Sequence, residues 1–217
     1  MTDKAFVFDT ALRLVTLTGV RAQSLRELRA RLPEVPLSSI FQHTHQEYLA
    51  HDFQRSQHYN DFARWVSETL REEPLGEKLA AIDLLAFTTL EELRAEIIST
   101  IDAYLAGLDR PSYECRPEDA FHFCQSRSFV LPTGLVAHDV PEFFARVGTI
   151  SNASLYFHFF EARLRLGRRT SDFSRWLSDR GRPDLAGAID ALNPYTRSLD
   201  DLRRDIVALG TSNGGAA

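Results

Sequence analysis

The sequence predicts a mainly α protein with minor β (an α+β protein), built from two tandem, pseudo-symmetric helical modules that pack together. Three observations lead to this prediction: an internal repeat, helix N-caps at matching places in both halves, and apolar residues at helical spacing after those caps. Apolar residues make up 44% of the 217 residues, which is enough for a sizeable core. A single module would bury a smaller fraction of its surface than a larger domain does, so packing of the two is expected.

The repeat is the strongest of these signals. Sliding the chain by 115 positions places residues 6–43 on residues 121–158 without a gap, and 11 of the 38 pairs are identical. The identical pairs include Phe6/Phe121, Phe8/Phe123, Gly19/Gly134, Ser39/Ser154 and His43/His158. Shorter matches follow in the same order: 60–65 with 171–176, 77–83 with 184–190, and 89–97 with 198–206. Collinear matches with loop-sized length differences predict an internal duplication.

Capping patterns predict where the helices begin. Ser24 with Glu27 and Thr89 with Glu92 have the spacing of a capping box, and similar pairs recur in the second half. Apolar residues at helical spacing follow each cap. Helices are therefore expected near 24–32, 38–52, 61–72, 76–86 and 90–106, with equivalents in the second half. A short β segment is expected at the start of each half, where FVF at 6–8 is followed by RLVTLTG and FHF at 121–123 is followed by SFVLPTG.

The repeat also predicts the domain boundaries. Residues 1–106 form the first module and 121–209 the second. The segment 107–120 between them is rich in turn-forming residues and is expected to be a linker. The Gly-rich end of the chain, 210–217, is expected to be a disordered tail.

Composition and missing motifs exclude several classes of function. A formal net charge of −5 argues against nonspecific nucleic-acid binding, which needs a basic surface. No apolar run approaches the length of a membrane span, and the N-terminus lacks the pattern of a signal peptide, so a cytoplasmic protein with no membrane partner is expected. Cys115 and Cys124 match no zinc or redox spacing. Phosphate-binding, dinucleotide-binding and nucleophile-elbow motifs are also missing.

Several runs of sequence resemble one known family. They are SSIFQHTHQEYLAHDF, YNDFARWV, LGEKLAAIDLL, FHFCQSRSFVLPTGLVAHDVPEFFARV, SLYFHFFEARLRLG and DFSRWLSD. Together they resemble the family of uncharacterised prokaryotic proteins known as domain of unknown function 5752, over about residues 4–209. The family has no assigned activity. The resemblance implies a link to carbohydrate metabolism, because members sit beside genes such as those of glycosyltransferases.

One set of polar and aromatic residues occurs in both halves. The set comprises His43, Asp61 and Trp65, with the counterparts His158, Asp172 and Trp176. A histidine oriented by an aspartate is the beginning of an acid–base pair. The same pair can instead hold two elements together, with the aspartate at a helix N-terminus. Two copies at matching places favour this structural interpretation.

The first half alone contains a cluster of histidines, which leaves a metal site as an alternative. His43, His45, Glu47 and His51 are the candidate ligands. On a helix, residues i and i+8 are about 12 Å apart, so one ion could not contact both His43 and His51. A metal would take one histidine with Glu47 and further ligands from elsewhere. The sequence otherwise predicts no cofactor.

The second half alone contains a cluster of arginines near a helix end. Arg163, Arg165, Arg168 and Arg169 are the candidate ligand-binding residues. Guanidinium groups suit a phosphate, a sugar phosphate or an acidic partner. The alternative is a solvated surface on which neighbouring carboxylates form salt bridges with the arginines.

These features favour a noncatalytic binding or regulatory protein that recognises a protein partner or a small anionic ligand, linked to carbohydrate metabolism. A metal-dependent enzyme using the first-half histidine cluster is an alternative, and a structural assembly protein is another. The missing catalytic motifs favour a protein without enzymatic activity. The prediction of a binding protein rests on half-specific chemistry placed on a shared scaffold.

Overall fold

The computed structural model describes residues 4–46, 60–108, 113–162, 170–193 and 198–212. The first half contains β1 (Phe6–Ala22), α1 (Leu25–Arg31), α2 (Leu37–Phe41), the π-helical turn η1 (Gln42–Gln46), α4 (Asp61–Glu68), α5 (Glu73–Ala80), the 3-10 turn η2 (Leu84–Ala86) and α6 (Leu90–Ala106). The second half contains the 3-10 turn η3 (Pro117–Asp119), β2 (Phe121–Ala137), α7 (Val140–Val147), α8 (Asn152–Tyr156), the π-helical turn η4 (Phe157–Glu161), α10 (Asp172–Asp179), α11 (Pro183–Asp190) and α12 (Leu199–Ser212).

The predicted caps begin the observed helices. The Ser24 side chain accepts a hydrogen bond from the backbone N–H of Glu27 at the start of α1. Thr89 and Glu92 form a reciprocal capping box at the start of α6. The counterparts in the second half begin α7 and α12. The strands and helices of the two halves thus follow one another in the same order, although the duplication itself stays a prediction.

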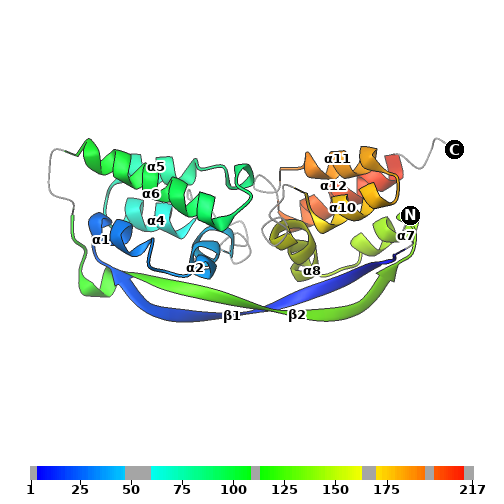
Figure 1. Cartoon of the computed structure of the whole chain (residues 1–217), viewed down its shortest axis with the longest axis horizontal. Coiled ribbons are helices and arrows are strands. Elements are labelled where there is room, and N and C mark those ends of the chain that lie inside the picture. The colour runs from blue at the N-terminus through cyan, green and yellow to red at the C-terminus, as the bar shows by residue number, and fades with distance from the viewer. Residues whose placement is uncertain (1–3, 47–59, 109–112, 163–169, 194–197, 213–217) are drawn as a thin grey trace. The chain divides into compact units, whose positions relative to one another are not determined.

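The two strands are much longer than the short β segments that the sequence predicts. β1 and β2 are each 17 residues long and pair as a two-stranded sheet (Figure 1). The Thr18 hydroxyl donates to the Phe123 carbonyl over 2.8 Å, and the Thr133 hydroxyl donates to the Phe8 carbonyl. Phe8 thus pairs with Thr133, whereas Thr18, further along β1, pairs with Phe123, which is earlier in β2. The two strands are therefore antiparallel.

A glycine occupies the same place in each strand for a conformational reason. Gly19 has a φ of 81° and Gly134 a φ of 77°. This left-handed region is accessible to glycine and costly for residues with a Cβ. The identity of this pair in the repeat therefore reflects the backbone of the strand.

The prediction of two tandem helical modules is wrong. The chain divides into unit 1, Met1–Arg13 with Ser128–Ala217, and unit 2, Leu14–Arg127. Each strand is long enough to begin in one unit and end in the other, so the first part of β1 packs on second-half helices. The first part of β2 packs on first-half helices in the same way. The fold is a two-stranded antiparallel ribbon with helices, and it is 57% helical. The first segment of each strand packs on the helices of the other half of the sequence, so the two halves exchange strand segments.

The unit boundaries therefore differ from the boundaries of the repeat at 1–106, 107–120 and 121–209. In the expected linker, the Cys115 N–H donates to the Gln23 carbonyl over 2.8 Å, and Glu114 forms a β-bridge with Ser24. These contacts belong to unit 2. At the other end of the chain, α12 continues to Ser212, and residues 213–217 of the expected tail lie outside the described residues.

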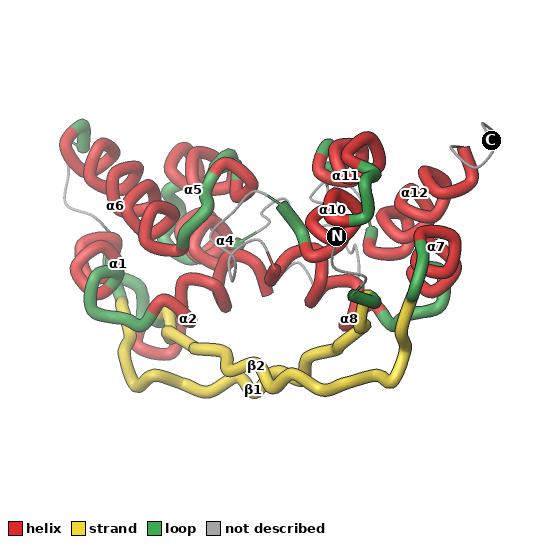
Figure 2. The backbone as a smooth tube through the Cα atoms, turned by 45° about the vertical axis from the view of Figure 1, so that its right-hand side comes forward, coloured by secondary structure: helices red, strands yellow, loops and turns green. Residues whose placement is uncertain are grey.

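Each unit has an aromatic core between its strand segments and its helices, which lie on one side of those segments (Figures 1 and 2). In unit 1, Phe6 and Phe8 of β1 pack against Phe143 of α7, with ring centroids 5.4 Å and 5.8 Å away. In unit 2, Phe121 of β2 stacks on Phe62 of α4 at 5.2 Å. The identical Phe pairs of the repeat thus fill corresponding cores. Within the described residues, no helix is long and apolar enough to cross a membrane.

Two glycines inside helices of unit 1 should respond oppositely to replacement by alanine. A Cβ on Gly210 of α12 would lie 2.4 Å from Cγ of Phe144, whereas a Cβ on Gly187 of α11 would meet nothing within 4 Å. Gly187→Ala should raise the free energy of unfolding by roughly 0.5–1 kcal/mol through helix propensity. Gly210→Ala should lower it by about 1–3 kcal/mol through overpacking. Urea denaturation of both variants measures the difference, and equal effects would contradict the packing of α12 on α7.

Candidate functional site

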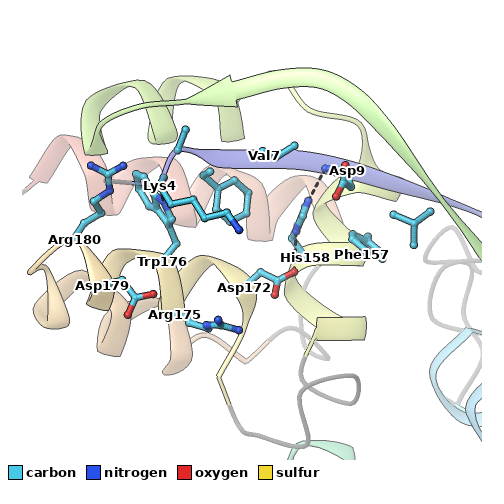
Figure 3. Close-up of a pocket in the computed structure, with 13 residues that line it drawn as sticks. Lys4, Val7, Asp9, Phe157, His158, Asp172, Arg175, Trp176, Asp179 and Arg180 are labelled. Atoms are coloured by element: carbon cyan, nitrogen blue, oxygen red, sulfur yellow. Dashed lines mark hydrogen bonds and ion pairs between the residues drawn. The ribbon is translucent and has the colours of Figure 1, made fainter. Parts of the chain in front are cut away.

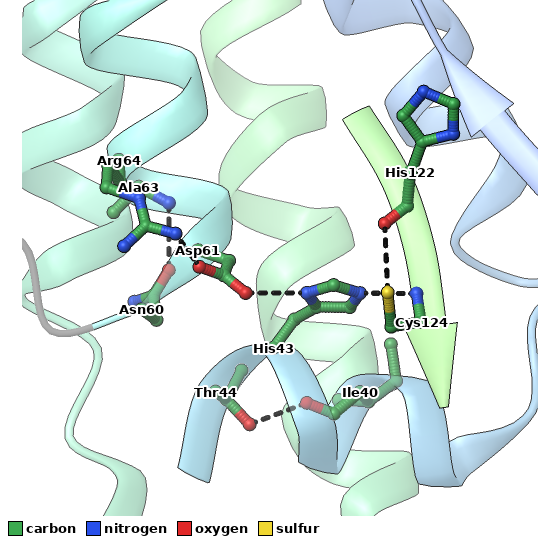
Figure 4. A network of polar contacts seen from close by, with 9 residues as sticks. All are labelled: Ile40, His43, Thr44, Asn60, Asp61, Ala63, Arg64, His122 and Cys124. Carbon is green, nitrogen blue, oxygen red and sulfur yellow. Dashed lines mark hydrogen bonds and ion pairs between the residues drawn. The ribbon is translucent and has the colours of Figure 1, made fainter. Parts of the chain in front are cut away.

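In unit 2, His43 connects a helix to a strand (Figure 4). Its Nδ1 lies 2.7 Å from Oδ2 of Asp61, at the beginning of α4. Its Nε2 accepts a hydrogen bond of 2.8 Å from the backbone N–H of Cys124, in β2. The imidazole is buried, with 4% of its surface exposed. Asp61 also accepts from the Arg64 guanidinium, one turn further along α4.

In unit 1, His158 makes the same two contacts. Its Nδ1 lies 2.9 Å from Oδ2 of Asp172 at the start of α10, and its Nε2 accepts from the backbone N–H of Asp9 over 2.8 Å. His158 is 3% exposed. The residue that donates to Nε2 differs between the units, aspartate in one and cysteine in the other, but only its backbone is used.

This geometry assigns the proton of each imidazole. A backbone N–H can only donate, so Nε2 must be the unprotonated nitrogen and Nδ1 must donate to the aspartate. Neither ring nitrogen is then available to take a proton from a substrate. The histidine and aspartate of each unit position a strand backbone, and their arrangement does not suit general acid–base catalysis.

The tryptophans of the repeated set also hold a strand segment, and they do so separately from the histidines. Trp176 Nε1 donates to the Lys4 carbonyl over 2.9 Å, and Trp65 Nε1 donates to the Asp119 carbonyl over 2.8 Å. Both indoles are 8% exposed. The beginning of each strand is therefore held at two points. The tryptophan binds a backbone carbonyl that precedes the first Phe, and the histidine binds the backbone N–H that follows the second Phe.

Sequence reasoning missed a serine in this arrangement. Ser154, one helical turn before His158, is fully buried and donates to the Asp9 carbonyl over 2.6 Å. Ser154 and His158 therefore bind both polar groups of one residue's backbone. The signal was available, because Ser39/Ser154 is an identical pair of the repeat that precedes each histidine by four residues.

His45 is buried but lies apart from these contacts. It is 4% exposed and stacks on Phe41, and its Nδ1 lies 2.8 Å from the Thr44 hydroxyl. Burial lowers the pKa of His45 to about 4, because the charged imidazole loses its hydration. At the matching positions of unit 1, Tyr156 stacks on Phe160.

The predicted metal ligands are only partly placed. Glu47 and His51 lie outside the described residues, so the structure does not bring the four candidates together. His43 is engaged at both ring nitrogens. Across the described part of the chain, no group of three or more His, Cys, Asp or Glu side chains could hold a metal ion. A metal site that uses Glu47 or His51 therefore stays a prediction.

His45 predicts a pH dependence of stability. Its pKa is about 6.5 when unfolded and about 4 when folded, so below pH 6.5 the unfolded chain binds a proton that the folded chain does not. The stability from neutral His45 is complete above pH 6.5 and is lost as the pH falls towards 4. His45→Phe, which copies Phe160, should remove this dependence. Between pH 7 and pH 5 the wild type should lose about 2 kcal/mol more than the variant in urea denaturation. Parallel pH profiles would contradict the burial of His45.

Unit 1 contains a cavity of about 600 Å³ between the beginning of β1 and helix α10 (Figure 3). Its charged lining consists of Lys4, Asp9, Asp172, Arg175, Asp179 and Arg180. Phe6, Val7, Val130, Phe157 and Trp176 contribute apolar surface. This volume is typical of sites for small molecules. Sequence reasoning missed the cavity because its two walls come from opposite ends of the chain.

Two cations in this cavity have no partner in the described part of the chain. The side chains of Lys4 and Arg175 are exposed and form no hydrogen bond or ion pair with a described residue. The Arg180 guanidinium lies over the Trp176 ring, 5.0 Å from its centroid. The other candidate cations, Arg163, Arg165, Arg168 and Arg169, lie outside the described residues.

The corresponding positions of unit 2 have different charges. Asp119 replaces Lys4, and Thr69 replaces Arg180. Arg64 replaces Arg175, but its guanidinium forms an ion pair with Asp61. The scaffold contacts recur in both units, whereas Lys4 and Arg180 have no cationic counterpart in unit 2.

Comparisons with known proteins agree with the sequence resemblance. The model of the family of unknown function DUF5752 matches residues 3–210. The structure of OrfY from Thermoproteus tenax is similar, with a TM-score of 0.85 and 28% sequence identity over 98% of this chain and 97% of that chain. No curated protein matches. Since the family model spans nearly the whole sequence, the chain belongs to the DUF5752 family of unknown function.

Proposed function

We propose that the protein is a noncatalytic binding protein that recognises a small anionic ligand in the cavity of unit 1. One observation carries this proposal: Lys4 and Arg175 line a cavity of ligand size and have no partner among the described residues. A guanidinium and an ammonium together favour a phosphate or carboxylate group. The anionic group of the ligand would pair with these two cations.

The carboxylates of the same cavity constrain the rest of the ligand. Asp9 and Asp179 line the cavity beside the cations. Ionised carboxylates accept hydrogen bonds, so they favour a ligand with hydroxyl or amino donors next to its anionic group. A sugar phosphate meets both requirements, and it fits the link to carbohydrate metabolism that the family resemblance implies.

The absence of catalysis in this proposal follows from the histidines. His158 borders the cavity, but its Nε2 is engaged by Asp9 and its Nδ1 by Asp172. A general base needs a free nitrogen within reach of the substrate. Binding without chemistry is therefore the simpler role for this site.

Recognition of a protein partner is the second candidate, and exposed apolar residues of the strands favour it. In unit 1, Leu12 is 63% exposed and Val130 52%; in unit 2, Leu17 is 68% exposed. Apolar strand residues exposed to this extent are typical of surfaces that bind other proteins. Of these three residues, Leu12 and Leu17 do not line the anion cavity, whereas Val130 does.

Isothermal titration calorimetry with three probes tests the anion site. Glucose 6-phosphate should bind, inorganic phosphate should bind more weakly, and glucose should not bind detectably. Arg175→Ala should weaken binding of glucose 6-phosphate roughly tenfold, the loss of one charged hydrogen bond. Arg26→Ala, which removes an exposed arginine from α1 in unit 2, is the control and should leave the affinity unchanged.

Two results would count against the proposal. If neither glucose 6-phosphate nor inorganic phosphate gave heat of binding at millimolar concentration, the proposed anion site would be contradicted. An equal loss of affinity in the Arg26→Ala and Arg175→Ala variants would show that binding depends on overall charge and not on this cavity.

A further inference from the structure

The same mode of strand binding occurs in both units. In unit 1 the bound segment places Phe6 and Phe8 in the core, and in unit 2 the bound segment places Phe121 and Phe123 there. In each unit a tryptophan donates to the carbonyl two residues before the first Phe. In each unit a histidine accepts from the N–H of the residue after the second Phe.

These contacts are of the kind that peptide-binding sites make with an extended peptide. Proteins that recognise an extended peptide bind its backbone with fixed polar groups and receive alternate side chains in pockets. The tryptophan and histidine supply the backbone contacts, and the aromatic core receives the two phenylalanines. Each set of helices thus holds an extended segment of the pattern Phe-x-Phe.

In unit 1 the recognised segment is separate in sequence from its binding site. It consists of the described residues 4–13, whereas the rest of the unit comes from Ser128–Ala217. Two further contacts attach it, because Ser154 donates to the Asp9 carbonyl and Arg13 forms an ion pair with Glu161. Both members of that ion pair are largely buried, with 11% of each side chain exposed.

We propose that unit 1 holds residues 4–13 as an exchangeable peptide, and that the same segment of a second copy of this chain competes for the site. The halves of this chain already exchange equivalent segments, since unit 2 holds the beginning of β2. A second copy would supply identical contacts, so the contact energy would differ little between exchanged and unexchanged forms. Protein concentration would then set the balance between them. This inference does not rest on the proposed anion site, although Lys4 and Asp9 of the same segment also line that cavity.

A synthetic peptide of residues 4–13, KAFVFDTALR, tests the docking site. The acceptor is the full chain with Phe6→Ser and Phe8→Ser, whose own segment can no longer fill the aromatic core. The peptide should bind this variant and return the unit 1 helices to protection against hydrogen exchange. A peptide with serine at both Phe positions is the control and should have no effect. If the variant unfolds, recovery of helical circular dichroism on adding the peptide is the readout.

Mixing two full-length variants tests the second copy as the occupant. The donor is the His158→Leu chain, which retains an intact segment but lacks the histidine that holds it. Light scattering should show dimers in the mixture with the Phe6→Ser, Phe8→Ser chain, and unit 1 of that acceptor should regain protection. Neither variant alone should do so.

Failure of the peptide to bind the acceptor at 1 mM would overturn the docking site. Binding of the peptide, with no mixed dimer at any protein concentration up to the solubility limit, would overturn the second copy as the occupant. A response to the serine-substituted peptide equal to that of KAFVFDTALR would show that the recognition is not of Phe-x-Phe.

Discussion

Replacing His43 with leucine is expected to lower the free energy of unfolding by about 3–5 kcal/mol. Leucine removes the imidazole partner of Asp61, which keeps its ion pair with Arg64, and leaves the Cys124 N–H without an acceptor in the interior of unit 2. A buried polar group without a partner costs more than the hydrogen bond contributed, because its hydration is not recovered. Urea denaturation at pH 7 measures the change.

His122→Leu is the matched control for this prediction. His122 lies on the same strand, two residues before Cys124, but its side chain is exposed. Its replacement should change the free energy of unfolding by less than about 0.5 kcal/mol. A small effect at both positions would mean that His43 does not link α4 to β2, and the structural role of the repeated histidine would be lost.

Replacing Phe8 with alanine should have a similarly large effect, about 3–5 kcal/mol. Phe8 is fully buried in unit 1, where its ring packs against Phe143 and Phe173. Truncation removes this apolar contact and leaves a cavity that a small core cannot fill. Thermal or urea denaturation followed by circular dichroism gives the magnitude.

Phe129→Ala is the control, since Phe129 lies in unit 1 on β2 with 49% of its surface exposed. Its loss should cost about 1 kcal/mol or less, because little buried area disappears. Equal costs for the two substitutions would show that the beginning of β1 is not part of the unit 1 core.

The helices could be predicted from the sequence because their signals are local. Ser24, Thr89 and Asp139 accept the hydrogen bonds that their spacing to a following glutamate predicts. The strands could not be predicted at their full length. Their middle parts expose apolar residues such as Leu14 and Val15 in succession, so the alternation of buried and exposed residues that identifies a strand is missing.

The exchange of strand segments could not be predicted from the sequence for a different reason. Phe6 and Phe121 are identical, and so are the tryptophans and histidines that surround them. The strand segment of either half would therefore fit equally well on the helices of its own half or on the helices of the other half. Strand length, which sets how far each segment reaches, was the missing information.

The candidate site shows the same limit. The pairing of His43 with Asp61 could be proposed because both residues recur in the second half. The cavity in unit 1 could not be predicted, because Lys4 and Arg175 are distant in sequence. Their counterparts in unit 2 also differ from them, since Asp119 replaces Lys4 and Arg64 forms an ion pair.

Hydrogen exchange of the Phe8→Ala and Phe123→Ala variants tests the exchanged arrangement most directly. Phe8 comes from the first half of the sequence but lies in unit 1, whose helices come from the second half. Phe123 comes from the second half but lies in unit 2, whose helices come from the first half. Phe8→Ala should therefore reduce protection in α7, α10 and α11, and Phe123→Ala should reduce it in α1, α4 and α5. Loss of protection in the helices of the same half as each substitution would contradict the account.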